Sequence, residues 1–95
     1  MPDAAGLPID HQSAHERFVV TVDGHEARVD YRREGHVLAL VHTDVPAAIG
    51  GRGIAGALVQ AVFDYARGEG LRVRPACSYA AAWIERHPEY ADLRA

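Results

Sequence analysis

The stretch Val45-Pro-Ala-Ala-Ile-Gly-Gly-Arg-Gly-Ile-Ala-Gly-Ala-Leu58 decides the fold, because four glycines fall within seven positions at the start of an amphipathic helix. The apolar run before it, residues 37–41, is too short for a helix and predicts a buried strand. A strand, a glycine-rich loop and a helix in succession predict an anion site. The N–H groups of a first helical turn are unpaired, and glycines admit a ligand close to the backbone. We expect the anion to be a phosphate of a cofactor.

Two common phosphate-binding patterns do not fit this loop. Gly51, Gly53 and Gly56 match the glycine spacing of the dinucleotide fingerprint. However, residues 42–50 separate them from the strand, and Pro-Ala-Cys-Ser at 75–78 stands where an acidic residue is required. The Gly-Lys-Ser or Gly-Lys-Thr of nucleotide-triphosphate loops is also missing from the sequence. The remaining interpretation is a loop that holds the pyrophosphate of coenzyme A.

Four sequence blocks, in this order, resemble the very short members of the GCN5-related N-acetyltransferase superfamily. The blocks are His42-Thr-Asp-Val-Pro46, Gly51-Arg-Gly-Ile-Ala55, Pro75-Ala-Cys-Ser-Tyr79 and Arg86-His-Pro-Glu-Tyr90. The resemblance covers residues 16–93 and departs from the family at Gly50, where the loop motif usually has Gln or Arg. It implies an acyl-CoA N-acyltransferase-like fold, acetyl-CoA as cofactor, and transfer of acetyl to an amine.

Periodicity predicts a single α/β domain with a mixed sheet in the order β-β-β-α-β-α. Residues 1–15 are expected to form a flexible leader before the domain of residues 16–95. Turn signals at Asp23-Gly24 and Glu34-Gly35 separate the first strands. Gly68 and Gly70 are expected to end the first helix, and Ser78 to cap the second. The expected strands are residues 16–22, 25–32, 36–41 and 71–76, and the first helix is residues 53–67.

Composition narrows the class of protein. The 95 residues carry 13 acidic and 10 basic side chains, a net charge of -3, so non-specific nucleic-acid binding has no electrostatic driver. The sequence contains no apolar run of about 18 residues and no signal-peptide pattern, so we expect a cytoplasmic protein without a membrane partner. Among the six histidines only His11 and His15 have a paired spacing, and we expect no metal. A monomer or weak dimer is expected.

The candidate cofactor residues follow the strand ends and the loop. Ligands bind at the carboxyl ends of parallel strands, here His42-Thr43 and Ala76-Cys77. The resemblance implies that these two strands part, that the pantetheine arm passes between them, and that the pyrophosphate lies on the loop. The predicted set is His42, Thr43, Val45, Gly50, Gly51, Arg52, Gly53, Ile54, Ala55, Cys77 and Ser78.

Cys77 and His42 are the candidate catalytic residues. Cys77 lies at a helix start, where a thiolate is favoured; it could be a nucleophile, line the thioester pocket, or only pack. His42 could be a general base or only bond a loop carbonyl. Tyr79 could protonate a departing thiolate, although packing is the favoured interpretation. Arg52 could contact a phosphate or remain solvated.

Three functions therefore remain open. The favoured one is an N-acetyltransferase whose acceptor amine is a small molecule or a protein tail. The second is a non-catalytic module that binds or senses acyl-CoA, and the third is an interaction domain that uses the sheet edge without a cofactor.

Overall fold

The computed structural model describes residues 7–95. The segments of alternating apolar residues that the sequence predicts as strands form the first strands of its sheet. Strands β2 (Arg17–Val22), β3 (His25–Glu34) and β4 (Val37–Asp44) form an antiparallel meander. Asp23 and Gly24 both have positive φ, 50° and 77°, as a two-residue hairpin turn requires. β4 extends three residues beyond its predicted end at Val41, because its last residues pair with β3 alone.

An additional strand, β1 (Asp10–Gln12), pairs antiparallel with β2. No strand is expected before Glu16, and an aromatic contact explains this difference. The His11 ring stacks on Phe18 with centroids 4.0 Å apart, and its Nε2 lies 2.6 Å from the Tyr31 hydroxyl. Of the predicted leader, residues 1–6 lie outside the described residues. Leu7 and Ile9 also pack against the core, and Ser13–His15 form a short 3-10 segment after β1.

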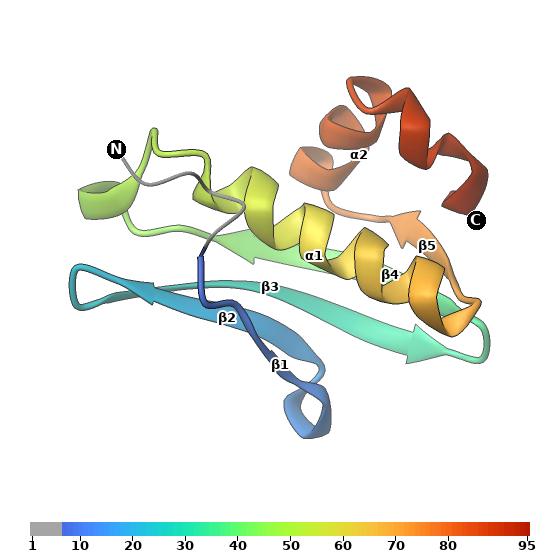
Figure 1. The fold of residues 1–95 in the computed structure, drawn as a ribbon, viewed down its shortest axis with the longest axis horizontal. Helices are drawn as coiled ribbons and strands as arrows, with labels where there is room; N and C mark the ends of the chain where they lie inside the picture. The colour runs from blue at the N-terminus through green and yellow to red at the C-terminus, as the bar shows by residue number, and fades with distance from the viewer. Residues whose placement is uncertain (1–6) are drawn as a thin grey trace.

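The second half of the chain adds a parallel crossover (Figure 1). Helix α1 (Ile54–Glu69) leads to β5 (Arg72–Pro75), which pairs with β4, and the sheet order is β1-β2-β3-β4-β5. The chain ends with α2 (Ser78–Glu85) and the 3-10 segment η4 (Pro88–Leu93). α1 runs through Gly68, which was expected to help end it, and ends at Gly70 in the left-handed conformation. The α/β fold with a mixed sheet is as predicted.

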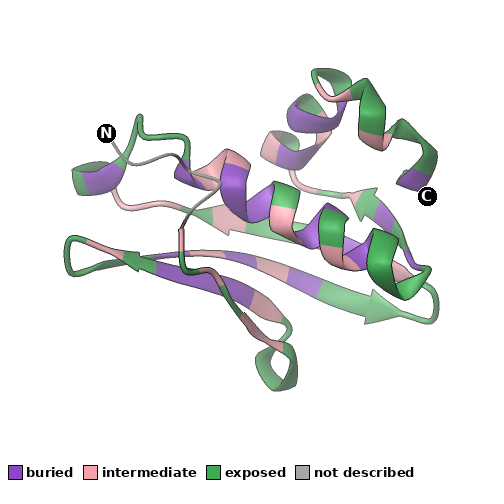
Figure 2. Cartoon of the chain, in the orientation of Figure 1, coloured by how far each residue is buried: buried purple, intermediate pink, exposed green. Residues whose placement is uncertain are grey.

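Both helices pack on the same face of the sheet. α1 and α2 meet through Phe63 and Trp83, whose rings stack with centroids 5.2 Å apart. Buried and exposed residues alternate along α1 (Figure 2), as expected for a helix with one apolar stripe. Neither helix is long and apolar enough to cross a membrane. The buried cluster between sheet and helices includes Phe18, Val20, Val29, Leu38, Leu40, Leu58, Val62, Phe63, Val73, Trp83 and Ile84.

In the described part of the chain, the sheet face that the helices do not cover carries charged side chains. The Arg28 guanidinium lies 3.3 Å from the Asp30 carboxylate and 3.6 Å from that of Asp44. Arg74 pairs with Glu34 at 2.7 Å on the same face. Because these charged side chains lie on it, the sheet face away from α1 and α2 is polar.

Candidate functional site

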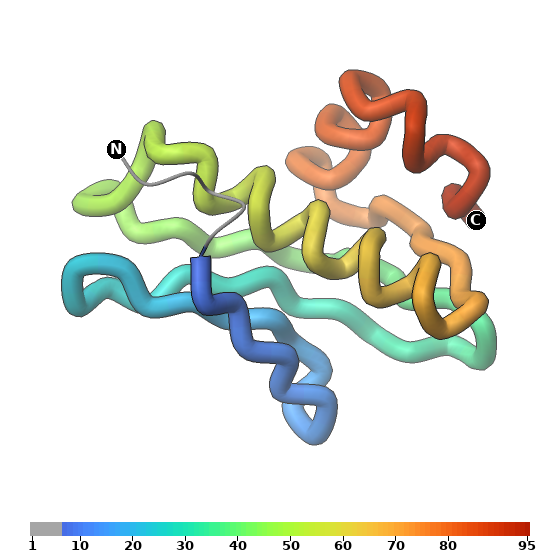
Figure 3. Tube along the Cα trace, in the orientation of Figure 1, coloured from blue at the N-terminus to red at the C-terminus, as the bar shows by residue number. Residues whose placement is uncertain are grey.

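The parallel strands β4 and β5 part midway along β4. Their last paired residues are Leu40 and Pro75, although β4 continues to Asp44. The Ala76 N–H does not continue the ladder, because it donates to the Arg74 carbonyl at 3.0 Å in a tight turn around Pro75. The Cys77 N–H still bonds the Leu40 carbonyl at 2.8 Å, and the chain then turns away into α2 while β4 runs on toward the glycine loop (Figure 3). The two backbones therefore part beyond Leu40, as predicted, and the side chains of Thr43 and Cys77 meet across the gap between them.

A β-bulge at Val41 decides which side chains face this gap. Tyr31 pairs with Leu40 and Asp30 pairs with His42, so Val41 is an extra residue in β4. After the bulge, His42 lies on the charged face of the sheet, beside Asp30 and away from the helices. Thr43, which pairs with buried Val29, lies on the helix side.

Thr43 and the start of α2 hold the sulfur of Cys77. The Thr43 Oγ1 lies 3.5 Å from the Cys77 Sγ, and the Ala80 N–H donates to the same sulfur at 3.4 Å. Cys77 therefore caps α2, and the prediction that Ser78 is the cap was wrong. Cys77 has the extended backbone that a cap requires (φ −90°, ψ 149°), whereas Ser78 is already the first helical residue. The half-buried sulfur thus lies at the positive end of a helix.

The glycine loop leads directly into α1, whose first backbone N–H groups are unpaired. Gly53, the cap residue of α1, has φ 76°, and the first helical bond runs from the Ala57 N–H to the Gly53 carbonyl at 3.0 Å. No side chain caps this end of α1, and its first turn contains no acidic residue. The N–H groups of residues 54–56 therefore have no partner within the helix. Gly51 also has a positive φ, 75°.

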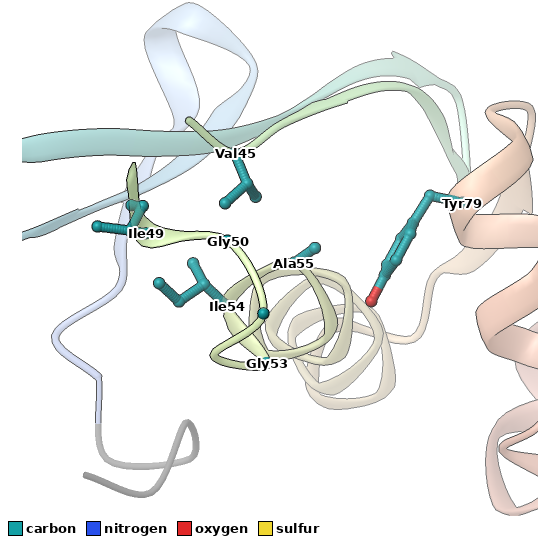
Figure 4. Close-up of a pocket in the computed structure, with 8 residues that line it drawn as sticks. Val45, Ile49, Gly50, Gly53, Ile54, Ala55 and Tyr79 are labelled. Carbon is teal, nitrogen blue, oxygen red and sulfur yellow. The ribbon is translucent and has the colours of Figure 1, made fainter. Parts of the chain in front are cut away.

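A hollow of about 260 Å³ lies against this loop and the first turn of α1 (Figure 4). Six of the residues that line it belong to the predicted cofactor set: Val45, Gly50, Gly51, Gly53, Ile54 and Ala55. The other two, Ile49 and Tyr79, are absent from that set. Tyr79 extends from α2 toward the first turn of α1. A Cβ added at Gly56 would lie 3.4 Å from the Tyr79 Oη, so the hydroxyl lies beside α1 at Gly56.

The remaining predicted residues lie away from the lining of the hollow. Arg52 forms an ion pair with Asp23 in the β2–β3 turn, which ties the loop to that hairpin. His42 and Cys77 lie on different sides of β4, so the two predicted catalytic residues are not brought together as a pair. Within residues 7–95, no group of three His, Cys, Asp or Glu side chains is arranged to hold a metal ion.

The chain is similar to known proteins in both sequence and fold. The family model described as GCN5-related N-acetyl-transferase matches residues 17–93. The protein NATD1 of Bos taurus is 35% identical over 88 residues, covering 87% of this chain and 78% of that protein; the Homo sapiens protein is 34% identical with the same shares. The solution NMR structure of a GCN5-like candidate N-acetyltransferase from Staphylococcus aureus superimposes with a TM-score of 0.74 at 27% identity. That superposition covers 94% of this chain and 88% of the other. The chain therefore belongs to the GCN5-related N-acetyltransferase family.

Proposed function

We propose that the protein binds acetyl-CoA and transfers its acetyl group to an amine. The observation that carries this proposal is the parting of β4 and β5 beside a loop with unpaired helical N–H groups. Family membership supports an acetyltransferase. A cofactor-free interaction domain would not need a glycine loop that lines a hollow.

The residues present fit the diphosphate of coenzyme A. Three free N–H groups at the start of α1 favour negative charge, and neither an acidic side chain nor a side-chain cap competes for them. Gly51 lines the hollow, and a Cβ added there would meet no atom within 4 Å. We assign the diphosphate to Gly51, Gly53 and the first turn of α1, and the pantetheine arm to the gap beyond Leu40. When bound, acetyl-CoA supplies an activated acetyl thioester.

The acceptor amine is assigned to the helix-free face of the sheet. His42 is exposed there and can accept the proton that an ammonium group must lose before it attacks a carbonyl. A backbone N–H at the end of β4 can stabilise the developing oxyanion. On the helix side, the Tyr79 hydroxyl can donate a proton to a departing thiolate. Cys77 either lines the thioester pocket or accepts the acetyl group on its sulfur.

Binding is tested by calorimetry with coenzyme A on two matched glycine variants. Gly51 and Gly35 both have positive φ, and a Cβ added at either meets no atom within 4 Å. Gly51→Ala and Gly35→Ala therefore both place alanine at a positive φ, but only Gly51 lines the hollow. We expect Gly51→Ala to weaken binding about tenfold and Gly35→Ala to leave it unchanged. An unsaturable titration of the parent protein at millimolar coenzyme A would contradict the proposal.

Turnover separates an enzyme from a module that only binds acyl-CoA. Release of free thiol from acetyl-CoA is followed with a panel of amines for the parent protein, His42→Gln and Cys77→Ala. We expect His42→Gln to lower kcat about 10²-fold with little change in KM, as for loss of a general base. Binding without amine-dependent thiol release would favour the sensor. An intact-mass shift of one acetyl group, absent in Cys77→Ala, would identify the route through the sulfur.

A further inference from the structure

The glycine loop is exposed between two buried residues. Residues 50–53 are all exposed, whereas Ile49 before them and Ile54 after them are buried. Three of these four residues are glycine, which loses more backbone freedom on folding than any other residue. Arg52 is the only residue in the range 45–53 with a polar side chain. It is therefore the one loop side chain that can restrain the loop by a hydrogen bond.

Arg52 forms this bond with the turn between β2 and β3. Its Nη1 donates to the Asp23 carboxylate at 2.5 Å, and the two side chains are 38% and 66% exposed. Asp23 occupies the first central position of the turn with φ 50°, and Gly24 follows with φ 77°. Asparagine suits this position as well as aspartate does, so the turn itself does not require a carboxylate. The charge of Asp23 serves the contact with Arg52.

The ion pair and the hollow are present in the same structure. Gly51 and Gly53 line the hollow, and Arg52 between them does not. The first N–H groups of α1 are free of helical partners while Arg52 is paired with Asp23. The hollow therefore forms without release of Arg52, and the ion pair is compatible with a loop that is ready to bind an anion.

We propose that Asp23 is a positioning residue for the glycine loop, and that it acts through Arg52 to restrain Gly51 and Gly53 before a ligand arrives. A loop that is already restrained loses less conformational freedom on binding, so its affinity for the ligand is higher. The identity of the ligand, coenzyme A, rests on the proposed function, whereas the restraint exists without any ligand. Exposed ion pairs are weak, so we expect a contribution of about threefold to Kd.

Calorimetry with coenzyme A on Asp23→Asn tests the contribution to binding. Asparagine keeps a preferred turn residue and removes the charge, and we expect Kd to rise about threefold. The control is Glu34→Gln, at the other end of β3, which breaks the similarly exposed pair with Arg74 and should leave Kd unchanged. Arg52→Gln should raise Kd at least as much as Asp23→Asn, and Arg52→Lys should stay within about twofold of the parent. In the Arg52→Gln background, Asp23→Asn should add nothing, because both changes remove one contact.

The sign of the change distinguishes a restraint from a competing charge. If Asp23 withheld Arg52 from the ligand or repelled its phosphates, Asp23→Asn would lower Kd. A lower or unchanged Kd in Asp23→Asn would overturn the proposal, and so would effects of the two variants that add in the double variant.

The restraint is also measured in the ligand-free protein, by the heteronuclear NOE of the Gly51 and Gly53 amides. We expect this NOE to fall in Asp23→Asn and Arg52→Gln and to keep its parent value in Glu34→Gln. Equal NOE values in the parent and Asp23→Asn would overturn the proposal. If the parent does not bind coenzyme A, the proposed function fails, and the NOE of Asp23→Asn still decides whether Asp23 restrains the loop.

Discussion

Gly56, in the first turn of α1, contacts the aromatic residues of α2. A Cβ at this position would lie 3.4 Å from the Tyr79 Oη and 3.6 Å from the Trp83 Nε1, which are ordinary contact distances. Gly68 is also helical, and a Cβ there meets nothing within 4 Å. We expect Gly68→Ala to raise the free energy of unfolding by about 1 kcal/mol, because alanine favours helix over glycine, and Gly56→Ala to raise it by no more. Urea denaturation measures both variants; a loss of stability in Gly56→Ala would show that α2 cannot tolerate the methyl group.

Single residues of the site differ in how well the sequence predicts them. The glycines could be predicted because their spacing and the helix after them carry the signal. Ser78 was favoured as a cap because hydroxyls are common caps, and a sulfur in that role has no pattern to reveal it. Tyr79 has the polarity of a site residue, but its place beside the hollow depends on α2 packing against α1. Ile49 could have been found, since an isoleucine in a glycine-rich loop suggests burial, and it is fully buried.

The short strand β1 is held by a contact that depends on pH. Burial lowers the pKa of His11 from its ordinary value of 6.5, against a smaller raising effect of Asp10. Burial also raises the pKa of Tyr31, with smaller effects from Tyr65, Glu16 and Arg33. A neutral imidazole that accepts from the phenol is therefore the favoured state of this 2.6 Å contact. Because the folded pKa is the lower one, His11 contributes its full stability above about pH 6.5 and loses it as the pH falls through the folded value.

The free energy of unfolding should therefore decrease between about pH 7.5 and pH 5, and His11→Phe should reduce that decrease. Phenylalanine keeps the stacking on Phe18 and contact with Tyr65 but cannot ionise. His36→Gln, in the exposed β3–β4 turn, is the control and should retain the decrease of the parent. Hydrogen exchange of the β1 and β2 amides locates the effect. An equal pH dependence in the parent and His11→Phe would rule out His11 as its source.

At the scale of elements, periodicity and turn chemistry predict the meander, the crossover and the two helices. β1 could not be predicted in this way, because three residues show no period and its stability comes from Phe18 and Tyr31 further along the chain. The bulge at Val41 also has no local sequence signal, because the apolar run of residues 37–41 would have the same pattern with or without an extra residue. That one residue reverses the faces of His42 and Thr43. Cys77 and His42, the two candidate catalytic residues, therefore lie on different sides of β4.

Across the whole molecule, side-chain contacts compensate for the short pairing between β4 and β5. The segment η4 is tied to α1 by the Tyr90 hydroxyl, which donates to Asp64 at 2.6 Å, and by Arg67, which lies 3.0 Å from the Asp92 carboxylate. The Arg67 pair is solvent-exposed and contributes little by itself. These ties join residues 25 or 26 positions apart in sequence, so local pattern cannot predict them. They attach the end of the chain to α1 and do not involve the residues of β4 beyond Leu40.

A ligand that bridges the gap should therefore stabilise the entire fold. The proposed ligand would contact the loop, α1 and the ends of β4 and β5, and it would bind the folded state alone. At a coenzyme A concentration of about 100 times Kd, the free energy of unfolding should rise by about 2.7 kcal/mol, and Tm by about 10 °C or more for a chain of this size. Thermal melts at increasing coenzyme A measure this rise, which should continue with the logarithm of concentration beyond Kd. Phosphopantetheine, which lacks the nucleotide and the second phosphate, should give a smaller shift, and Gly51→Ala should need about tenfold more coenzyme A for the same shift. A constant Tm across the titration would mean that the gap and the loop do not form one binding site.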